Sequence, residues 1–149
     1  MSMLEKAFPV RLIKGAHEFE KAFEVRRTVF IEEQKVPESI ERDEHDASGD
    51  HVVAVDEGRI IGTGRLAIIH SFPRIGRMAV LQEYRGQGVG RAILLKLLEV
   101  AQAKKFPEVH LAAQLPVEEF YRKMGFGPYG EIFEEASILH RMMKRKLPS

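Results

Sequence analysis

The 149-residue sequence contains no cysteine, and this absence excludes several kinds of chemistry. Without cysteine the chain can form no disulfide, no thiolate metal site and no cysteine nucleophile, and a reducing compartment is permitted. No apolar run reaches the roughly 20 residues that a membrane span needs. Residues 1–6 also lack the apolar core and cleavage site of a signal peptide. We therefore expect a cytoplasmic protein without a membrane partner.

The sequence also lacks a strong excess of either charge. Its formal net charge of +1 gives no reason to expect a nucleic-acid partner, and the short basic cluster at 144–146 has no interleaved aromatic residues. The charge is uneven, because residues 1–50 contain 8 Lys and Arg against 12 Asp and Glu, whereas the remainder contains 15 against 10. The basic part would suit a polyanionic cofactor and the acidic part a cationic substrate. Solvated surface charge explains the same imbalance.

No repeat, low-complexity tract or flexible linker interrupts the chain, so residues 1–149 are predicted to form a single domain. The apolar periodicity predicts an α/β (α+β) fold in which helices cover a mixed sheet. The predicted strands are 8–14, 51–56, 59–69, 73–81, 109–113 and two last strands ending near 146. The predicted helices are 17–33, 89–104 and 117–124, and residues 34–49 are an ordered loop or a short helical piece. Glu57 and Gly58 form a hairpin turn.

The segment with the strongest chemical signal is a glycine turn between a predicted strand and a predicted helix, Arg85-Gly86-Gln87-Gly88-Val89-Gly90-Arg91. Such a turn can bind phosphate, because the first amides of a helix lack internal partners and the helix dipole favours an anion. No Lys-Ser or Lys-Thr follows Gly90, as a P-loop requires, and the glycine spacing is not that of a dinucleotide fold. Both nucleotide alternatives are therefore weakened.

This turn resembles the acetyl-CoA motif of the GNAT superfamily, Gln/Arg-x-x-Gly-x-Gly/Ala, with Arg85, Gly88 and Gly90 at the matching positions. The preceding Met78-Ala79-Val80 is similar to the bulged strand that pairs with the pantetheine arm in that family, and residues 120–126 are similar to its second cofactor motif. The stretch 25–37, together with Glu41, Asp43 and Asp46, resembles the small bacterial ElaA/YjcF-like branch.

The resemblance implies a mostly antiparallel sheet of about seven strands, splayed open at a bulged fourth strand, with helices on both faces. It implies that acetyl-CoA lies in the cleft between two strands, and that a homodimer is possible. The residues that it assigns to acetyl-CoA are Met78, Ala79, Val80, Arg85, Gly86, Gln87, Gly88, Val89, Gly90, Arg91, Gln114 and Tyr121.

Acetyl transfer to an amine needs a base, support for the developing oxyanion and a proton for the departing thiolate. Tyr121 occupies the family position of the general acid, although simple packing would also explain an aromatic residue there. His140, on the last predicted strand, is similar to the histidine base of some members. A carboxylate acting through water is the alternative, with Glu33, Glu41, Asp43 and Asp46 as the candidates. No Gly-x-Ser-x-Gly elbow is present, so direct transfer in a ternary complex is expected.

The acceptor is not fixed by the sequence. The candidate substrate residues are Arg26, Glu33, Asp43 and Asp46. The acidic run favours a cationic acceptor, whereas Arg26, Arg65, Arg74 and Arg77 would favour a carboxylate or phosphate if they face the cleft. Arg26 lies within an apolar stripe and needs an acidic partner, so a structural ion pair competes with a substrate contact.

We expect an N-acetyltransferase acting on a primary amine of a small molecule or peptide. A non-catalytic acyl-CoA-binding sensor is the alternative. No metal is expected, because neither His-Glu-x-x-His nor calcium-loop spacing is present.

Overall fold

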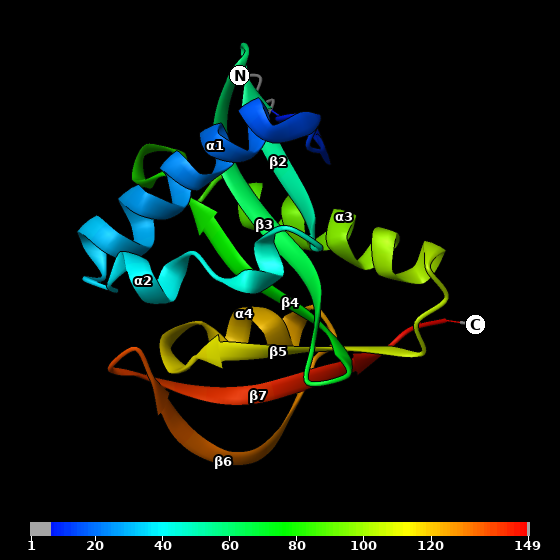
Figure 1. Cartoon of the computed structure of the whole chain (residues 1–149). Helices are drawn as coiled ribbons and strands as arrows, with labels where there is room; N and C mark the ends of the chain where they lie inside the picture. Colours follow the sequence, from blue (N-terminus) through cyan, green and yellow to red (C-terminus); the bar gives the residue numbers. More distant parts are fainter. Residues whose placement is uncertain (1–6, 149) are drawn as a thin grey trace, which may run out of the picture.

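Seven strands form one sheet in the order β1-β2-β3-β4-β5-β7-β6 in the computed structural model, which describes residues 7–148 (Figure 1). The strands are β1 (Val10–Leu12), β2 (Asp50–Asp56), β3 (Arg59–Ile69), β4 (Phe72–Val80), β5 (Glu108–Gln114), β6 (Gly127–Glu135) and β7 (Ile138–Lys146). The α-helices are α1 (Gly15–Arg26), α2 (Glu38–Glu41), α3 (Val89–Ala103) and α4 (Glu118–Lys123). The 3-10 turns are η2 (Glu44–Asp46), η3 (Gln82–Tyr84) and η4 (Leu115–Val117). The predicted mixed sheet of about seven strands is confirmed.

The sheet opens between β4 and β5, which form its one parallel pair among the described residues. These strands are paired at only two positions, Arg74 with His110 and Ile75 with Leu111. Figure 1 shows the arrows of β4 and β5 pointing apart beyond this junction. All other neighbouring strands are antiparallel. The predicted splay of the sheet is therefore present, and its closed end lies at Arg74.

A β-bulge lies on β4 just beyond the junction with β5. The pairing register shifts between Thr63 and Arg65 of β3, so that Gly64 opposes two residues of β4, Arg77 and Met78. Arg77 has φ 53, in the left-handed region that non-glycine residues rarely adopt. Bulges of this kind re-aim side chains and end regular pairing, and they are frequent beside active sites. The bulge predicted in the fourth strand is confirmed.

The two faces of β3 contact different helices. On one face, a Cβ added at Gly62 or Gly64 would lie within 3 Å of Ile93 of α3, so glycine allows this helix to approach the sheet closely. On the other face, Arg65 alternates with these glycines and bonds the segment that follows α1. Figure 1 shows α1 and α3 flanking the strands on opposite sides. Helices therefore cover both faces, as expected.

The predicted helix 17–33 is present but changes type half-way. Its first part is α1, and its second part, η1 (Arg27–Glu33), is a π-helix. The amide of Gln34 accordingly bonds the carbonyl of Val29 at 3.1 Å, five residues back. The Thr28 hydroxyl also donates to the carbonyl of Glu24 at 3.1 Å, a contact that competes with regular helix bonding. π-helical turns are frequent at functional sites.

None of the helices within residues 7–148 is long and apolar enough to span a membrane.

Candidate functional site

A cavity of about 750 Å³ lies where β4 and β5 diverge. Its walls come from β4, β5, η1, α4, β7 and the segment around α2. The predicted site residues that line it are Glu33, Glu41, Asp43, Met78, Ala79, Val80, Arg85, Gly90, Gln114, Tyr121 and His140. The sequence motifs, far apart in the chain, therefore meet around one cavity.

The glycine turn borders the cavity at the N-terminus of α3, where Arg85 and Gly90 are its two lining residues. Gly86 and Gly88 have φ 77 and 81, a backbone conformation that favours glycine. The first hydrogen bond of α3 runs from the amide of Ala92 to the carbonyl of Gly88 at 3.0 Å. The amides of Val89, Gly90 and Arg91 precede it and have no helical carbonyl to bond. Gly90 lines the cavity, whereas Gly86, Gln87, Gly88, Val89 and Arg91 are not part of its lining.

The Arg85 side chain joins three parts of the cavity wall. Its Nε donates to the carbonyl of Val80 at 2.9 Å, and its guanidinium forms an ion pair with Glu33 at 2.9 Å. A second bridge also reaches η1, where the side-chain Nε2 of Gln114 donates to the side-chain Oε1 of Gln34 at 2.9 Å. Sequence reasoning missed Gln34, because no local pattern indicates that it lies beside β5. The two bridges hold the end of η1 against β4 and β5.

Tyr121 reaches the cavity from α4 and is 9% exposed. Its ring packs edge-on against Phe120 and Phe126, with centroid distances of 5.1 and 6.0 Å. Burial raises the pKa of Tyr121 to about 12. The hydroxyl has no hydrogen-bond partner among the described residues, so the phenol stays protonated at neutral pH and can donate into the cavity. The ring of Tyr121 is thus packed in the core while its hydroxyl remains available, so packing and a proton-donor role are compatible.

His140 lines the same cavity from β7 and is 8% exposed. Its Nδ1 lies 2.7 Å from the carbonyl oxygen of Ile138, and its ring stacks on Phe133. A carbonyl oxygen can only accept, so Nδ1 carries the proton and the neutral ring has an acceptor at Nε2. No described residue is hydrogen-bonded to Nε2. The arrangement leaves a fixed imidazole with one available lone pair.

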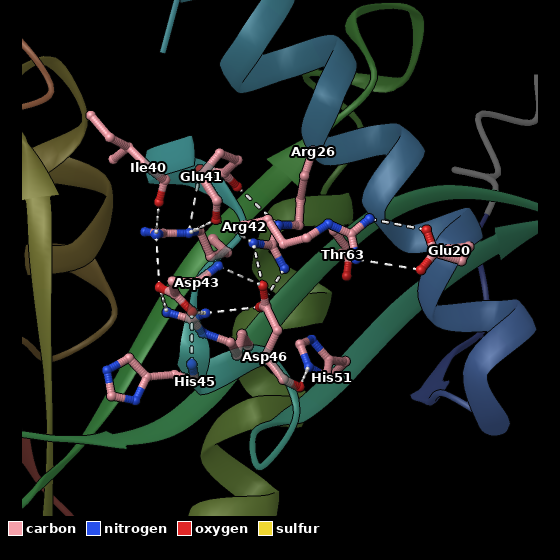
Figure 2. A network of polar contacts seen from close by, with 12 residues as sticks. Glu20, Arg26, Ile40, Glu41, Arg42, Asp43, His45, Asp46, His51 and Thr63 are labelled. Atoms are coloured by element: carbon pink, nitrogen blue, oxygen red, sulfur yellow. Dashed lines mark hydrogen bonds and ion pairs between the residues drawn. The ribbon is translucent and has the colours of Figure 1, made fainter. Parts of the chain in front are cut away.

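Arg26 is 1% exposed, and it forms the centre of a buried ion network beside the cavity (Figure 2). Its Nε bonds Glu41 at 2.9 Å, and its two terminal nitrogens bond Asp46 at 2.7 and 3.3 Å. One of these nitrogens also donates to the carbonyl of Glu41 at 2.7 Å. The predicted ion pair of Arg26 is therefore confirmed. Neither Arg26 nor Asp46 lines the cavity. These two candidate substrate residues therefore support the cavity wall from the protein interior and do not contact a ligand in the cavity.

Two further arginines extend this network to the cavity. Arg65 bonds Asp43 at 2.6 Å and Asp46 at 2.9 Å. Arg77, whose strained backbone marks the bulge, bonds Asp43 at 3.0 Å and Glu41 at 3.3 Å. Figure 2 shows dashed contacts that join Glu41, Asp43 and Asp46 to the other residues of the network. Most carboxylates of the acidic run that favoured a cationic acceptor are thus paired with arginines of the chain itself.

The pKa of Asp46 makes the network sensitive to acid. Burial alone would raise this pKa, but the hydrogen bonds and charge of Arg26, with smaller contributions from Asp43 and Arg65, lower it to about 2. A carboxylate whose pKa is lower in the folded chain than in the unfolded chain stabilises the fold at pH values above its unfolded pKa, which is near 3.9. This stabilisation is lost as the pH falls from the unfolded pKa toward the folded pKa. We expect about 2 kcal/mol to be lost between pH 4 and pH 2.

Urea unfolding of Asp46→Asn checks this expectation. The difference in unfolding free energy between the natural chain and the variant should be largest above pH 4 and should narrow toward pH 2. Asp50→Asn is the matched control, because Asp50 pairs with Lys104 at a partly exposed position and lies outside the network. A difference for Asp46→Asn that stays constant from pH 2 to pH 6 would contradict the assignment.

Within residues 7–148, no group of three or more His, Cys, Asp or Glu side chains is placed to hold a metal ion.

The splayed sheet and the glycine turn fit an acyltransferase that takes acyl-CoA as its co-substrate, which is the class that the family comparison gives. Residues 15–147 match the family model described as an acetyltransferase (GNAT) domain. The chain therefore belongs to the GNAT acetyltransferase family.

Its relatives include members of the expected bacterial branch. The chain is 34% identical over 136 residues to the uncharacterized N-acetyltransferase YjcF of Bacillus subtilis (strain 168), covering 90% of this chain and 96% of the relative. It is 29% identical over 130 residues to ElaA of Escherichia coli (strain K12), covering 83% and 84%. The crystal structure of an acyl-CoA N-acyltransferase from Pseudomonas aeruginosa superposes with a TM-score of 0.84 at 28% identity, covering 93% and 99%. The ElaA/YjcF-like assignment is confirmed.

Proposed function

We propose that this acyltransferase uses acetyl-CoA and transfers the acetyl group directly to a primary amine of a small molecule or peptide. The observation that carries the proposal is the meeting of three features around one cavity: the glycine turn of α3, the free hydroxyl of Tyr121 and the available Nε2 of His140. An acyl-CoA donor supplies a thioester, which an amine can attack without any covalent enzyme intermediate. The chain has no cysteine to carry an acetyl group.

The glycine turn, which borders the cavity at Arg85 and Gly90, is suited to phosphate. The unbonded amides at the start of α3 and the positive end of its dipole favour an anion. Glycine at 86 and 88 keeps side chains away from this surface, and an added Cβ would meet no atom within 4 Å there, so the space is open to a ligand. The residues present therefore fit a pyrophosphate-bearing co-substrate.

His140 is the group best placed to accept a proton from the amine. The four rival carboxylates are each held by an arginine: Glu33 by Arg85, Glu41 and Asp46 by Arg26, and Asp43 by Arg65. Burial would raise the pKa of Asp43 and Asp46, but the hydrogen bonds and charges of Arg65 and Arg26 lower it, so these two carboxylates are weaker bases. Burial raises the pKa of Glu41, but its two carboxylate oxygens are already engaged by Arg26 and Arg77. His140 has no acidic partner among the described residues, and its ring is oriented by Ile138.

Calorimetric titration with acetyl-CoA tests the donor site. We expect Gly88→Asp to weaken binding by at least about 100-fold, since a carboxylate at the turn repels the pyrophosphate and occupies its space. Gly58→Asp is the matched control, because Gly58 has a similar φ of 85 in the β2–β3 turn and does not line the cavity. Equal affinity of natural chain and Gly88→Asp, or no binding by the natural chain, would overturn the proposed donor.

A further inference from the structure

Four arginines line the cavity, and three of them are held by carboxylates of the chain. Arg65 bonds Asp43 and Asp46, Arg77 bonds Glu41 and Asp43, and Arg85 bonds Glu33. The fourth, Arg74, forms neither an ion pair nor a hydrogen bond with any described residue. Its side chain is partly buried, so water compensates the guanidinium less completely than at an exposed site. Arg74 is therefore the cation of the cavity that remains available to a ligand.

Arg74 lies at the end of the cavity opposite the glycine turn. It occupies the first of the two paired positions of β4 and β5, opposite His110, and Ile75 at the second position lies between it and the diverging part of the strands. Six residues of extended strand separate it from Val80, which corresponds to about 20 Å. The pyrophosphate site proposed at α3 is therefore too far away to be the partner of this guanidinium. An anion bound at Arg74 would belong to the other substrate.

The groups around Arg74 do not neutralise it. His110, its neighbour on β5, already has both ring nitrogens engaged, one with the hydroxyl of Tyr129 and the other with Glu108. Two acids of the cavity lining, Glu44 and Glu135, lack an arginine partner, but both are exposed and their charges are screened by water. A ligand anion that enters the cavity consequently meets an unpaired guanidinium at its closed end.

We propose that Arg74 binds an anionic group of the acceptor, so that the substrate is an amine bearing a carboxylate or a phosphate. This inference rests on the proposed function. A guanidinium presents paired N–H donors that match the two oxygens of a carboxylate or phosphate, which fixes orientation as well as charge. The conflict between the acidic and basic indications of the sequence is thereby resolved, because the candidate acids Glu33, Glu41, Asp43 and Asp46 are paired with arginines of the chain and Arg74 has no acidic partner among the described residues.

Acetylation of matched amines tests the inference. The carboxylate arm compares glycine, β-alanine, L-leucine and L-phenylalanine with their amides, and the phosphate arm compares phosphoethanolamine with ethanolamine. The natural enzyme should favour the anionic member of at least one pair in kcat/KM by roughly 10- to 100-fold. Arg74→Gln should remove this preference by lowering kcat/KM for the anionic member far more than for the neutral member, whereas Arg74→Lys should restore part of the preference. The comparison that shows the preference, carboxylate or phosphate, identifies which anionic group Arg74 binds. Arg59→Gln, an exposed change outside the cavity, is the control.

Equal use of charged and neutral members by the natural enzyme would overturn the inference, as would an equal loss for both in Arg74→Gln. Calorimetry with acetyl-CoA keeps this result separate from failure of the proposed function. If acetyl-CoA binds but no amine is acetylated, the anionic members are titrated into the acetyl-CoA complex. If acetyl-CoA does not bind, they are titrated into the free protein. In either titration, binding that Arg74→Gln abolishes supports the anion site, and absence of binding by every anionic member refutes it.

Discussion

Replacing Tyr121 with phenylalanine will lower kcat for acetyl transfer by about 100-fold or more and leave the Kd for acetyl-CoA nearly unchanged. The substitution removes one oxygen and keeps the ring, so the edge-on contacts with Phe120 and Phe126 are retained. The lost hydroxyl has no partner within residues 7–148, and its removal leaves no described donor or acceptor unpaired. If Tyr121 is the general acid, as its family position implies, only the departing thiolate loses a proton donor, and the loss is confined to the chemical step.

Steady-state kinetics and calorimetry on the same preparations measure this separation. Tyr84→Phe is the matched control, because Tyr84 donates to Asp56 at 2.7 Å and does not line the cavity. That variant should keep kcat within about twofold. Since burial raises the pKa of Tyr121 to about 12, its ionisation should not appear in the pH–rate profile below about pH 11. A Tyr121→Phe enzyme with unchanged kcat would assign the ring to packing alone.

The parts of the fold that sequence could predict are those with a local signal. The glycine turn is one, because left-handed φ values at Gly86 and Gly88 require a residue type that the sequence displays. The Glu57-Gly58 hairpin is another, with both residues at positive φ. The position of Tyr121 in the cavity was predicted from the second motif at residues 120–126, whose first part lies on the short helix α4. In each case neighbouring residues along the chain determine the geometry.

The ion network could not be predicted, since its members meet only after the sheet has formed. The place of Arg26 in an apolar stripe indicated that it needs an acidic partner. Nothing in the sequence, however, selects Glu41 and Asp46 among the acids that follow. The left-handed backbone of Arg77 is equally invisible, because it arises from the register of β4 against β3. The difference between the paired Arg65 and the unpaired Arg74 depends on the same tertiary arrangement. Substrate recognition was therefore the part that sequence left open.

Arg26→Leu should reduce the free energy of unfolding by about 3 to 5 kcal/mol, the largest stability effect that we expect in this chain. The cost comes from the partners that remain, because Glu41 and Asp46 are 3% and 8% exposed and lose their central cation. Burial already raises the pKa of Glu41, and without Arg26 its ionisation becomes still less favourable. Domains commonly have 5 to 15 kcal/mol of stability, so the variant should remain folded at low temperature.

Urea unfolding at neutral pH tests this, with Arg27→Leu as the matched control on the next residue. Arg27 pairs with Glu38 where both side chains are about half exposed, so its replacement should cost no more than about 1 kcal/mol. Equal losses for the two variants would show that the buried network contributes nothing special. Because Glu41 and Asp43 of this network also line the cavity, Arg26→Leu should raise KM for the acceptor more than it raises the Kd for acetyl-CoA. The network would then link the stability of the α1–α2 segment to the shape of the acceptor site.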